Sequence, residues 1–158
     1  MDLSSYILGI ISTIIAFYLT KIIENKIKKK NNLKYLKREF EFNIDIIERF
    51  TKHCEKILKA IEVGDEIHEY FALYKFQKTA FNNCLNYGYL YDKFENKDIS
   101  ILNGVISFFS EDNEKSINKI IRWINEKYNV DFAKEAVNKF KEELENKKGA
   151  LLKLKNKL

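Results

Sequence analysis

The strongest feature of the hydrophobic pattern is an uninterrupted apolar stretch near the start of the chain. No charged residue occurs between Leu3 and Thr20, and apolar residues continue to Ile23 after a single lysine, Lys21. As a helix, residues 3–23 would be about 31 Å long, which matches the roughly 30 Å hydrocarbon core of a bilayer. Their strongly apolar side chains favour insertion by roughly 3 to 5 kcal/mol in total. The pattern predicts a transmembrane anchor over residues 3–23, with Lys21 reaching toward the lipid headgroups.

Two alternatives to a permanent anchor stay open at this point. A cleaved signal peptide would have basic residues before the apolar stretch and a small-residue cleavage site after it. Here Asp2 precedes the stretch and lysines follow it. The second alternative is an unusually apolar helix of a soluble protein. We favour the uncleaved anchor because the flanking charges suit it.

After the anchor, apolar positions recur every three or four residues, which is the period of amphipathic helices. There is no proline to interrupt them. The first pattern runs from Leu33 to Ile61, can continue directly from the anchor, and ends near Gly64 as a C-cap. Further helices are expected over about 65–87, 98–128 with a break near 110–113, and 131–146 with Asp131 as N-cap. The expected fold is all-α: a single N-terminal transmembrane helix, then a cytosolic bundle of about four helices over residues 39–146.

Asn43 interrupts the apolar seam of the first of these helices at a core position. A buried Asn lowers stability unless it is paired, although it can also fix register or oligomeric state. We favour a hydrogen bond to a neighbouring element of the same chain over a contact between chains.

A basic segment follows the anchor directly. Residues 21–38 contain eight Lys or Arg and one acid, a net charge of +7. By the positive-inside rule, this flank stays in the cytoplasm and the N-terminus faces outward. The prediction is a single-pass protein of a bacterial inner membrane, with residues 24–38 as a basic juxtamembrane segment and with Cys54 and Cys84 as free thiols in a reducing compartment. The side chains expected to contact lipid headgroups are Lys21, Lys26, Lys28, Lys29 and Lys30.

The rest of the chain divides by charge into an acidic middle and a basic end. Residues 39–146 carry a net charge of −6, whereas residues 147–158 contain five lysines and no acid. Nucleic-acid binding would favour basic charge on the folded domain itself, so membrane lipids are the expected partners and nucleic acid is not. The segment 147–158 is predicted to be a basic amphipathic tail that lies on the membrane surface or stays loose.

One face of the anchor is small and weakly polar. On a helical projection its residues fall within an arc of roughly 100°, with four-residue spacings typical of helices that approach closely in lipid. Three interpretations stay open: hydroxyls that only satisfy their own helix, an interface for a homo-oligomer, or the wall of a pore. The residues of this face are Ser5, Gly9, Ser12, Thr13, Ala16 and Thr20.

The sequence shows little catalytic chemistry. It has two histidines, no Cys-x-x-Cys pair, no phosphate-binding Gly loop and no nucleophile elbow, so we expect no metal, no cofactor and no enzyme activity. Arg49 and His53 are the candidates for an exception, because at four-residue spacing they share a helix face. We favour a solvated Arg49 and a half-buried His53 over a catalytic pair, and a surface position for His68.

The single span, the basic segment and a helical bundle of this size together resemble the membrane accessory proteins of type VI-B CRISPR systems. Those subunits form a ring-shaped membrane pore and have a divergent bundle of the HEPN nuclease class. HEPN nucleases separate their Arg and His by four to six residues, whereas three lie between Arg49 and His53. The resemblance implies an oligomeric pore or membrane-perturbing effector in antiphage defence.

Three functional hypotheses follow. The first is a non-enzymatic, single-pass membrane protein that forms homo-oligomers through the small face of its anchor and its bundle. The second is a membrane-tethered ribonuclease that uses Arg49 and His53. The third is a membrane scaffold whose acidic middle recruits a cytosolic protein partner.

Overall fold

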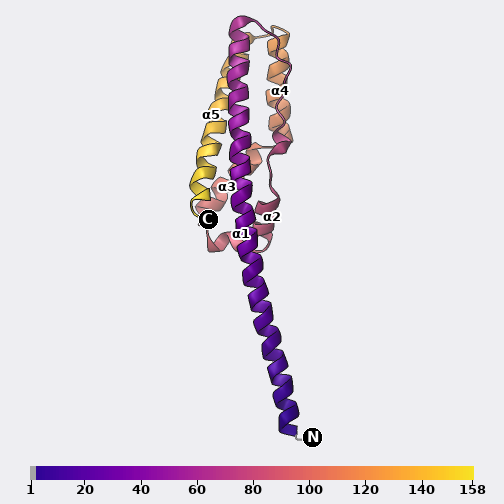
Figure 1. Cartoon of the computed structure of the whole chain (residues 1–158). Coiled ribbons are helices and arrows are strands. Elements are labelled where there is room, and N and C mark those ends of the chain that lie inside the picture. Colours follow the sequence, from indigo (N-terminus) through magenta and orange to yellow (C-terminus); the bar gives the residue numbers. More distant parts are fainter. Residues whose placement is uncertain (1–2) are drawn as a thin grey trace.

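One continuous helix organises the whole molecule. The computed structural model describes residues 3–158, with side chains from Tyr6 onward. Helix α1 extends unbroken from Leu3 to Val63, and its N-terminal part projects from the body of the protein (Figure 1). It therefore crosses the expected limits of the anchor and the juxtamembrane segment, at residues 23 and 38, without interruption. The direct continuation of the anchor into the first bundle helix is confirmed.

Gly64 ends α1, as its sequence predicts. Its φ of +82° lies in the left-handed region, where glycine carries no steric penalty. The amides of Gly64 and Asp65 both donate to the carbonyl of Ala60, at 2.8 and 3.0 Å. The Asp65 bond is the long closing bond of a Schellman motif and the Gly64 bond is that of an αL motif, and both satisfy a carbonyl at the helix C-terminus.

The remaining elements are all helical, and no strand occurs among residues 3–158. The predicted break in the third helical stretch is confirmed, because Ser110 separates two helices and its hydroxyl accepts from the amide of Asn113 at 3.3 Å. The elements after α1 are η1 (Leu73–Lys75), α2 (Thr79–Asn86), η2 (Tyr89–Asp92), α3 (Asn96–Phe108), α4 (Glu111–Asn125) and α5 (Val130–Lys155).

The helix expected over residues 65–87 is largely wrong. Only Thr79–Asn86 forms an α-helix, and residues 65–78 form an extended connection, here called the strap, which contains the short turn η1. The strap buries Ile67 and Phe71, whose four-residue spacing imitates a helical pattern. Its backbone is bound by asparagine side chains of other elements instead of by its own helix.

Three asparagines each bind both backbone groups of one strap residue. Asn125 accepts from the amide of Ile67 at 2.9 Å and donates to its carbonyl at 2.8 Å. Asn118 makes the same pair of bonds with Phe71, at 2.8 and 2.9 Å. Asn43 makes it with Gln77, at 2.8 Å for both bonds. These contacts satisfy polar groups that would otherwise be unpaired beside the core.

Helix α5 packs antiparallel along α1 and is longer than expected. It begins after Asn129, whose φ of +47° is in the left-handed region, so the predicted N-cap Asp131 lies inside the helix. The prediction of a loose or membrane-bound tail over 147–158 is also wrong: α5 continues to Lys155, and Leu151 and Leu154 are buried. The helix expected to end at Asn146 runs through Gly149 without interruption.

An ion-pair ladder with a seven-residue repeat joins these two helices. A repeat of seven keeps successive side chains on the same side of a helix pair, so the ladder follows the seam and specifies the antiparallel register. The four Nζ–Oε1 pairs are Lys155–Glu41 at 3.4 Å, Lys148–Glu48 at 2.7 Å, Lys141–Glu55 at 2.9 Å and Lys134–Glu62 at 3.1 Å.

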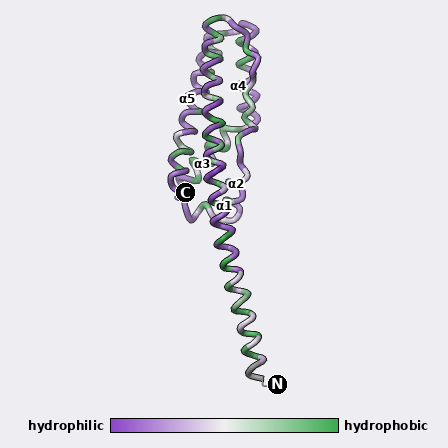
Figure 2. The backbone as a smooth tube through the Cα atoms, viewed as in Figure 1, coloured by the Kyte–Doolittle hydropathy of each residue, from purple (hydrophilic) through white to green (hydrophobic). Residues whose placement is uncertain are grey.

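The apolar core lies between α1, α5 and the shorter helices. The seam of α1 predicted from the sequence is buried from Leu36 to Ile57, with its two ends, Leu33 and Ile61, partly buried. In Figure 2 the projecting N-terminal part of α1 is coloured mainly green to white, whereas purple alternates with green and white along the bundle. Apolar side chains therefore lie in two places: buried in the core of the bundle and exposed on the projecting part of α1.

Candidate functional site

The projecting part of α1 is long and apolar enough to cross a membrane, by length and composition. Its most apolar 18-residue window has a mean hydropathy of 1.9, and none of that window is buried. Large side chains such as Leu8, Phe17 and Tyr18 are 66, 63 and 62 % exposed. Contiguous apolar residues exposed to this extent are typical of a surface that contacts a membrane or another protein.

The hydroxyls of the small face are hydrogen-bonded within their own helix. Ser12 and Thr13 donate to the carbonyl of Gly9 at 2.9 and 2.8 Å, and Thr20 donates to that of Ala16 at 2.9 Å. A methyl group added at Gly9 would meet no atom within 4 Å. The side chain of Ser5 lies outside the described residues. This face is therefore open and polar only to a small degree.

Two of the five lysines expected to contact lipid headgroups contact the bundle instead. Lys28 Nζ lies 4.0 Å from the centre of the Tyr87 ring, and Lys29 forms a 2.6 Å ion pair with Asp92. These contacts join α1 to the region around η2, just beyond the apolar part of the helix. Of the other three, Lys21 lies over the Phe17 ring at 5.8 Å, Lys26 is exposed, and Lys30 borders a cavity described below.

Asn43 is buried, as its position in the seam predicts, and its partner belongs to the same chain. Because its amide oxygen and nitrogen both bind Gln77 of the strap, the side chain has its main hydrogen bonds without a second subunit. The expected neighbouring helix is replaced by an extended segment. Sequence patterns alone do not reveal such a partner.

The structure brings Arg49 and His53 to the same cavity, of about 350 Å³, which Tyr70 and Lys75 also line. Arg49 is exposed, whereas His53 is mostly buried and its ring packs edge-on against Phe71 at 4.7 Å. This is the solvated Arg and half-buried His that the sequence favoured. His68, on the neighbouring strap, is exposed as expected.

Burial and one backbone contact define the chemistry of His53. Nε2 lies 3.2 Å from the carbonyl oxygen of Glu69, whereas Nδ1 is buried without a hydrogen bond, 3.4 Å from the Glu69 carboxylate. Desolvation lowers the pKa of His53, and the Glu69 backbone contact opposes this only in part. The imidazole is therefore neutral at neutral pH and holds the strap against α1.

Both cysteines are buried free thiols, as predicted. Burial raises the pKa of Cys54 to about 12 and that of Cys84 to about 11. Neither thiol is a nucleophile at neutral pH, because the thiolate is the reactive form.

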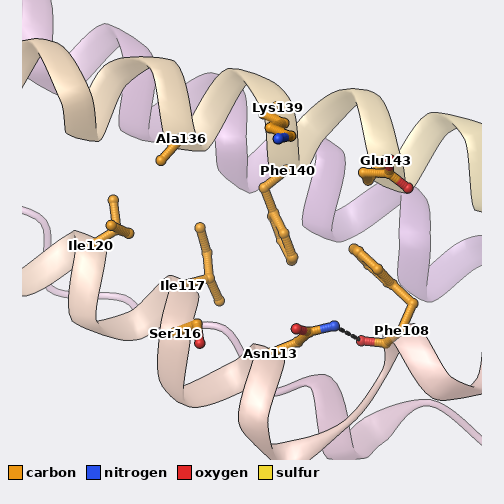
Figure 3. A pocket seen from close by; sticks show the side chains of 9 residues that line it. All are labelled: Phe108, Asn113, Ser116, Ile117, Ile120, Ala136, Lys139, Phe140 and Glu143. Atoms are coloured by element: carbon orange, nitrogen blue, oxygen red, sulfur yellow. Dashed lines mark hydrogen bonds between the residues drawn. The ribbon is translucent and has the colours of Figure 1, made fainter.

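A second cavity, of about 280 Å³, lies between α4 and α5 and is largely apolar. Figure 3 shows the rings of Phe108 and Phe140 converging there, and they stack with centroids 5.4 Å apart. Two polar side chains of the lining are hydrogen-bonded to nearby backbone. Asn113 donates to the carbonyl of Phe108 at 2.8 Å, and Ser116 donates to that of Asp112 at 2.8 Å. The lining therefore suits an apolar group more than a catalytic reaction.

Residues 3–158 contain no group of three His, Cys, Asp or Glu that could hold a metal ion. No protein-family model, no curated protein and no solved structure matches the chain. The resemblance to type VI-B CRISPR accessory proteins stays a prediction from architecture. What the fold defines is an all-helical protein with an exposed apolar helix that continues into a helical bundle.

Proposed function

We propose that this is a non-enzymatic, single-pass membrane protein that self-associates and holds a cytosolic helical bundle at a fixed orientation to the bilayer. The observation that carries the proposal is the continuity of α1. The same helix supplies an exposed apolar segment of membrane-spanning length and the central seam of the bundle. A helix without a break transmits tilt and rotation between the two.

The contacts after the anchor support this coupling. The Lys28–Tyr87 and Lys29–Asp92 contacts hold the bundle against α1 within about two turns of Ile23, the end of the apolar segment. The basic flank supports a cytoplasmic position for the bundle, by the positive-inside rule.

Self-association is proposed through the small face that contains Gly9 and Thr13. Helices in lipid associate by close packing of small residues, and Gly9 leaves its surroundings open. We limit the proposal to self-association rather than a pore, because the hydroxyl protons of Ser12, Thr13 and Thr20 are already donated within the helix. The scaffold hypothesis is less supported, since four acids of the middle segment pair with α5.

The test is the mass of the detergent-solubilised full-length protein, measured by light scattering. We expect a dimer or larger oligomer for the wild type and a shift toward monomer for Gly9→Leu, which fills the small face. The matched control is Ile14→Phe, which enlarges the opposite face of the same helix and should leave the mass unchanged. A monomeric wild type contradicts the proposal, as does equal loss of oligomer in both variants.

A membrane-tethered ribonuclease is the second candidate, and the observation that favours it is the cavity shared by Arg49, His53 and Lys75. Cleavage of single-stranded RNA by the wild type, abolished by His53→Ala and retained by His68→Ala, would establish it. RNA left intact by the wild type removes this candidate.

A further inference from the structure

A third cavity lies where α1 enters the bundle. Its volume is about 720 Å³, against about 350 Å³ for the cavity beside His53 and about 280 Å³ for the cavity between α4 and α5. Its lining comes from α1, from the residue after η2 and from the C-terminal end of the described chain, which Figure 1 shows beside the base of the projecting helix. The lining includes Ile27, Lys30, Lys34, Lys37, Lys93 and Leu158.

Four lysines surround this cavity, and no Asp or Glu lines it. None of the four ammonium groups forms an ion pair within residues 6–158. The second basic cluster differs: Lys147, Lys148, Lys155 and Lys157 are paired with Glu143, Glu48, Glu41 and Asp98. The Lys157–Asp98 pair, at 2.7 Å, lowers the pKa of Asp98 and keeps that carboxylate charged. Four lysines without an ion pair therefore gather at this one cavity.

If residues 3–23 span the bilayer, the end of the cavity formed by Ile27 and Lys30 lies next to the lipid headgroups, so this step rests on the proposed function. Ile27 is about 6 Å and Lys30 about 10 Å beyond Ile23 along the helix, and the headgroup layer is roughly 5 to 8 Å thick. Side chains on a helix tilt toward its N-terminus, so Lys34 and Lys37, one and two turns further on, incline toward the membrane. Lys93 approaches the same space from the other side.

We propose that this cavity binds the phosphate of an anionic phospholipid headgroup. Lys30, Lys34, Lys37 and Lys93 contact the phosphate oxygens as point charges, and Ile27 contacts the less polar glycerol region. Such a basic pocket beside the cytoplasmic end of a span is suited to anionic headgroups. The cavity is more specific than a basic segment that attracts lipid only by its net charge. Three of its lysines lie on one face of α1, and the fold brings the fourth, Lys93, from a distant part of the sequence.

The test is a titration of the detergent-solubilised full chain with four probes, in which binding is measured as a rise in the midpoint of thermal unfolding. The probes are dioctanoyl phosphatidylglycerol, dioctanoyl phosphatidylcholine, inorganic phosphate and a short RNA. We expect phosphatidylglycerol to bind at least tenfold more tightly than the other three. The triple variant Lys34→Gln, Lys37→Gln, Lys93→Gln should weaken that binding at least tenfold.

The matched control removes the same charge from the far end of α1 by Lys52→Gln, Lys56→Gln and Lys59→Gln, and should bind like the wild type. Equal affinity for the two lipids, or equal loss in both triple variants, overturns the site. Free phosphate binding as tightly as phosphatidylglycerol overturns its assignment to lipid, and tight, variant-sensitive binding of a short RNA in place of the lipid assigns it to nucleic acid. The titration is done in detergent, so it tests the lipid site whether or not residues 3–23 span a membrane. Membrane extraction of the same proteins tests the span separately.

Discussion

Asn43, Asn118 and Asn125 each use a side-chain amide as a substitute for a neighbouring strand. An amide presents one donor and one acceptor at the spacing of a backbone peptide group, so it can bind both groups of a single extended residue. The strap is thereby held beside α4 and α1 without a sheet. The positions Asn118 and Asn125 are two turns apart on α4, which places both on the face that meets the strap.

Replacing Asn118 by Ala should lower the free energy of unfolding by about 2–4 kcal/mol. The change removes both hydrogen bonds to Phe71 and leaves its partly buried backbone groups unpaired. Thermal or denaturant unfolding of the solubilised protein measures the effect. Asn138→Ala, an exposed position on α5, is the control and should change stability by less than about 0.5 kcal/mol. Similar stability of the two variants would show that the strap does not depend on this amide.

His53 should make stability fall in mildly acidic solution. Its folded-state pKa lies below the unfolded value of about 6.5, so the unfolded chain binds more protons just below that pH. Stability conferred by the neutral imidazole is complete above pH 6.5 and declines as the pH falls toward the folded-state pKa. Unfolding curves between pH 7.5 and 5 measure this, and His53→Gln should flatten the dependence whereas His68→Gln should not. A dependence that persists in His53→Gln assigns the effect to other groups.

At this scale the sequence identified Asn43 as a core polar residue and His53 as half-buried, because each interrupts or borders a helical seam. Asn118 and Asn125 were missed, since polar residues on an amphipathic helix give no signal of an extended partner. The cations of the lysine cavity were missed in part. Lys30, Lys34 and Lys37 belong to the predicted basic segment, but Lys93 joins them only through the fold.

The helices α1 and α5 are paired by a seam and by the ladder that runs along it. The lysine partners lower the pKa of Glu48 and Glu55, and Glu55 raises the pKa of Lys141. These groups are accessible to solvent, so the attraction is screened and each pair adds little by itself. Their regular spacing matters more for register than for total stability.

Exchanging the charges of one rung tests the ladder. Glu55→Lys should lower the unfolding midpoint because it places two cations together, and adding Lys141→Glu should restore most of the loss. At 1 M salt the difference between the single and double variants should shrink, because charges near the surface are screened. If the double variant is no more stable than Glu55→Lys alone, residues 55 and 141 do not interact across the helix pair.

The predicted helix boundaries agree with the structure where apolar residues recur every three to four positions over several turns. The seam of α1 and the break before α4 are of this kind. The prediction failed where apolar spacing arose in a non-helical segment, as at Ile67 and Phe71, and where the last helix was expected to end at residue 146, before Gly149. In the second case, burial of Leu151 and Leu154 outweighs the low helix propensity of one glycine.

For the whole molecule, the continuity of α1 links the proposed membrane segment to the bundle. The described chain has two exposed features that the bundle does not use, the apolar surface from Tyr6 to Ile23 and the lysine cavity next to it. Both lie at the same end, and together they suit a bilayer: an apolar span, then a positively charged layer. The acidic charge of the middle segment and the lysines of α5 largely compensate each other within the bundle.

Alkaline carbonate extraction of membranes from cells that express the full-length protein tests the central claim most directly. The protein should remain entirely in the membrane pellet at its full mass of 18.8 kDa, because an uncleaved span is not released by high pH or salt. Release into the supernatant, or recovery as a shortened secreted product, would contradict the claim that residues 3–23 are a permanent transmembrane helix.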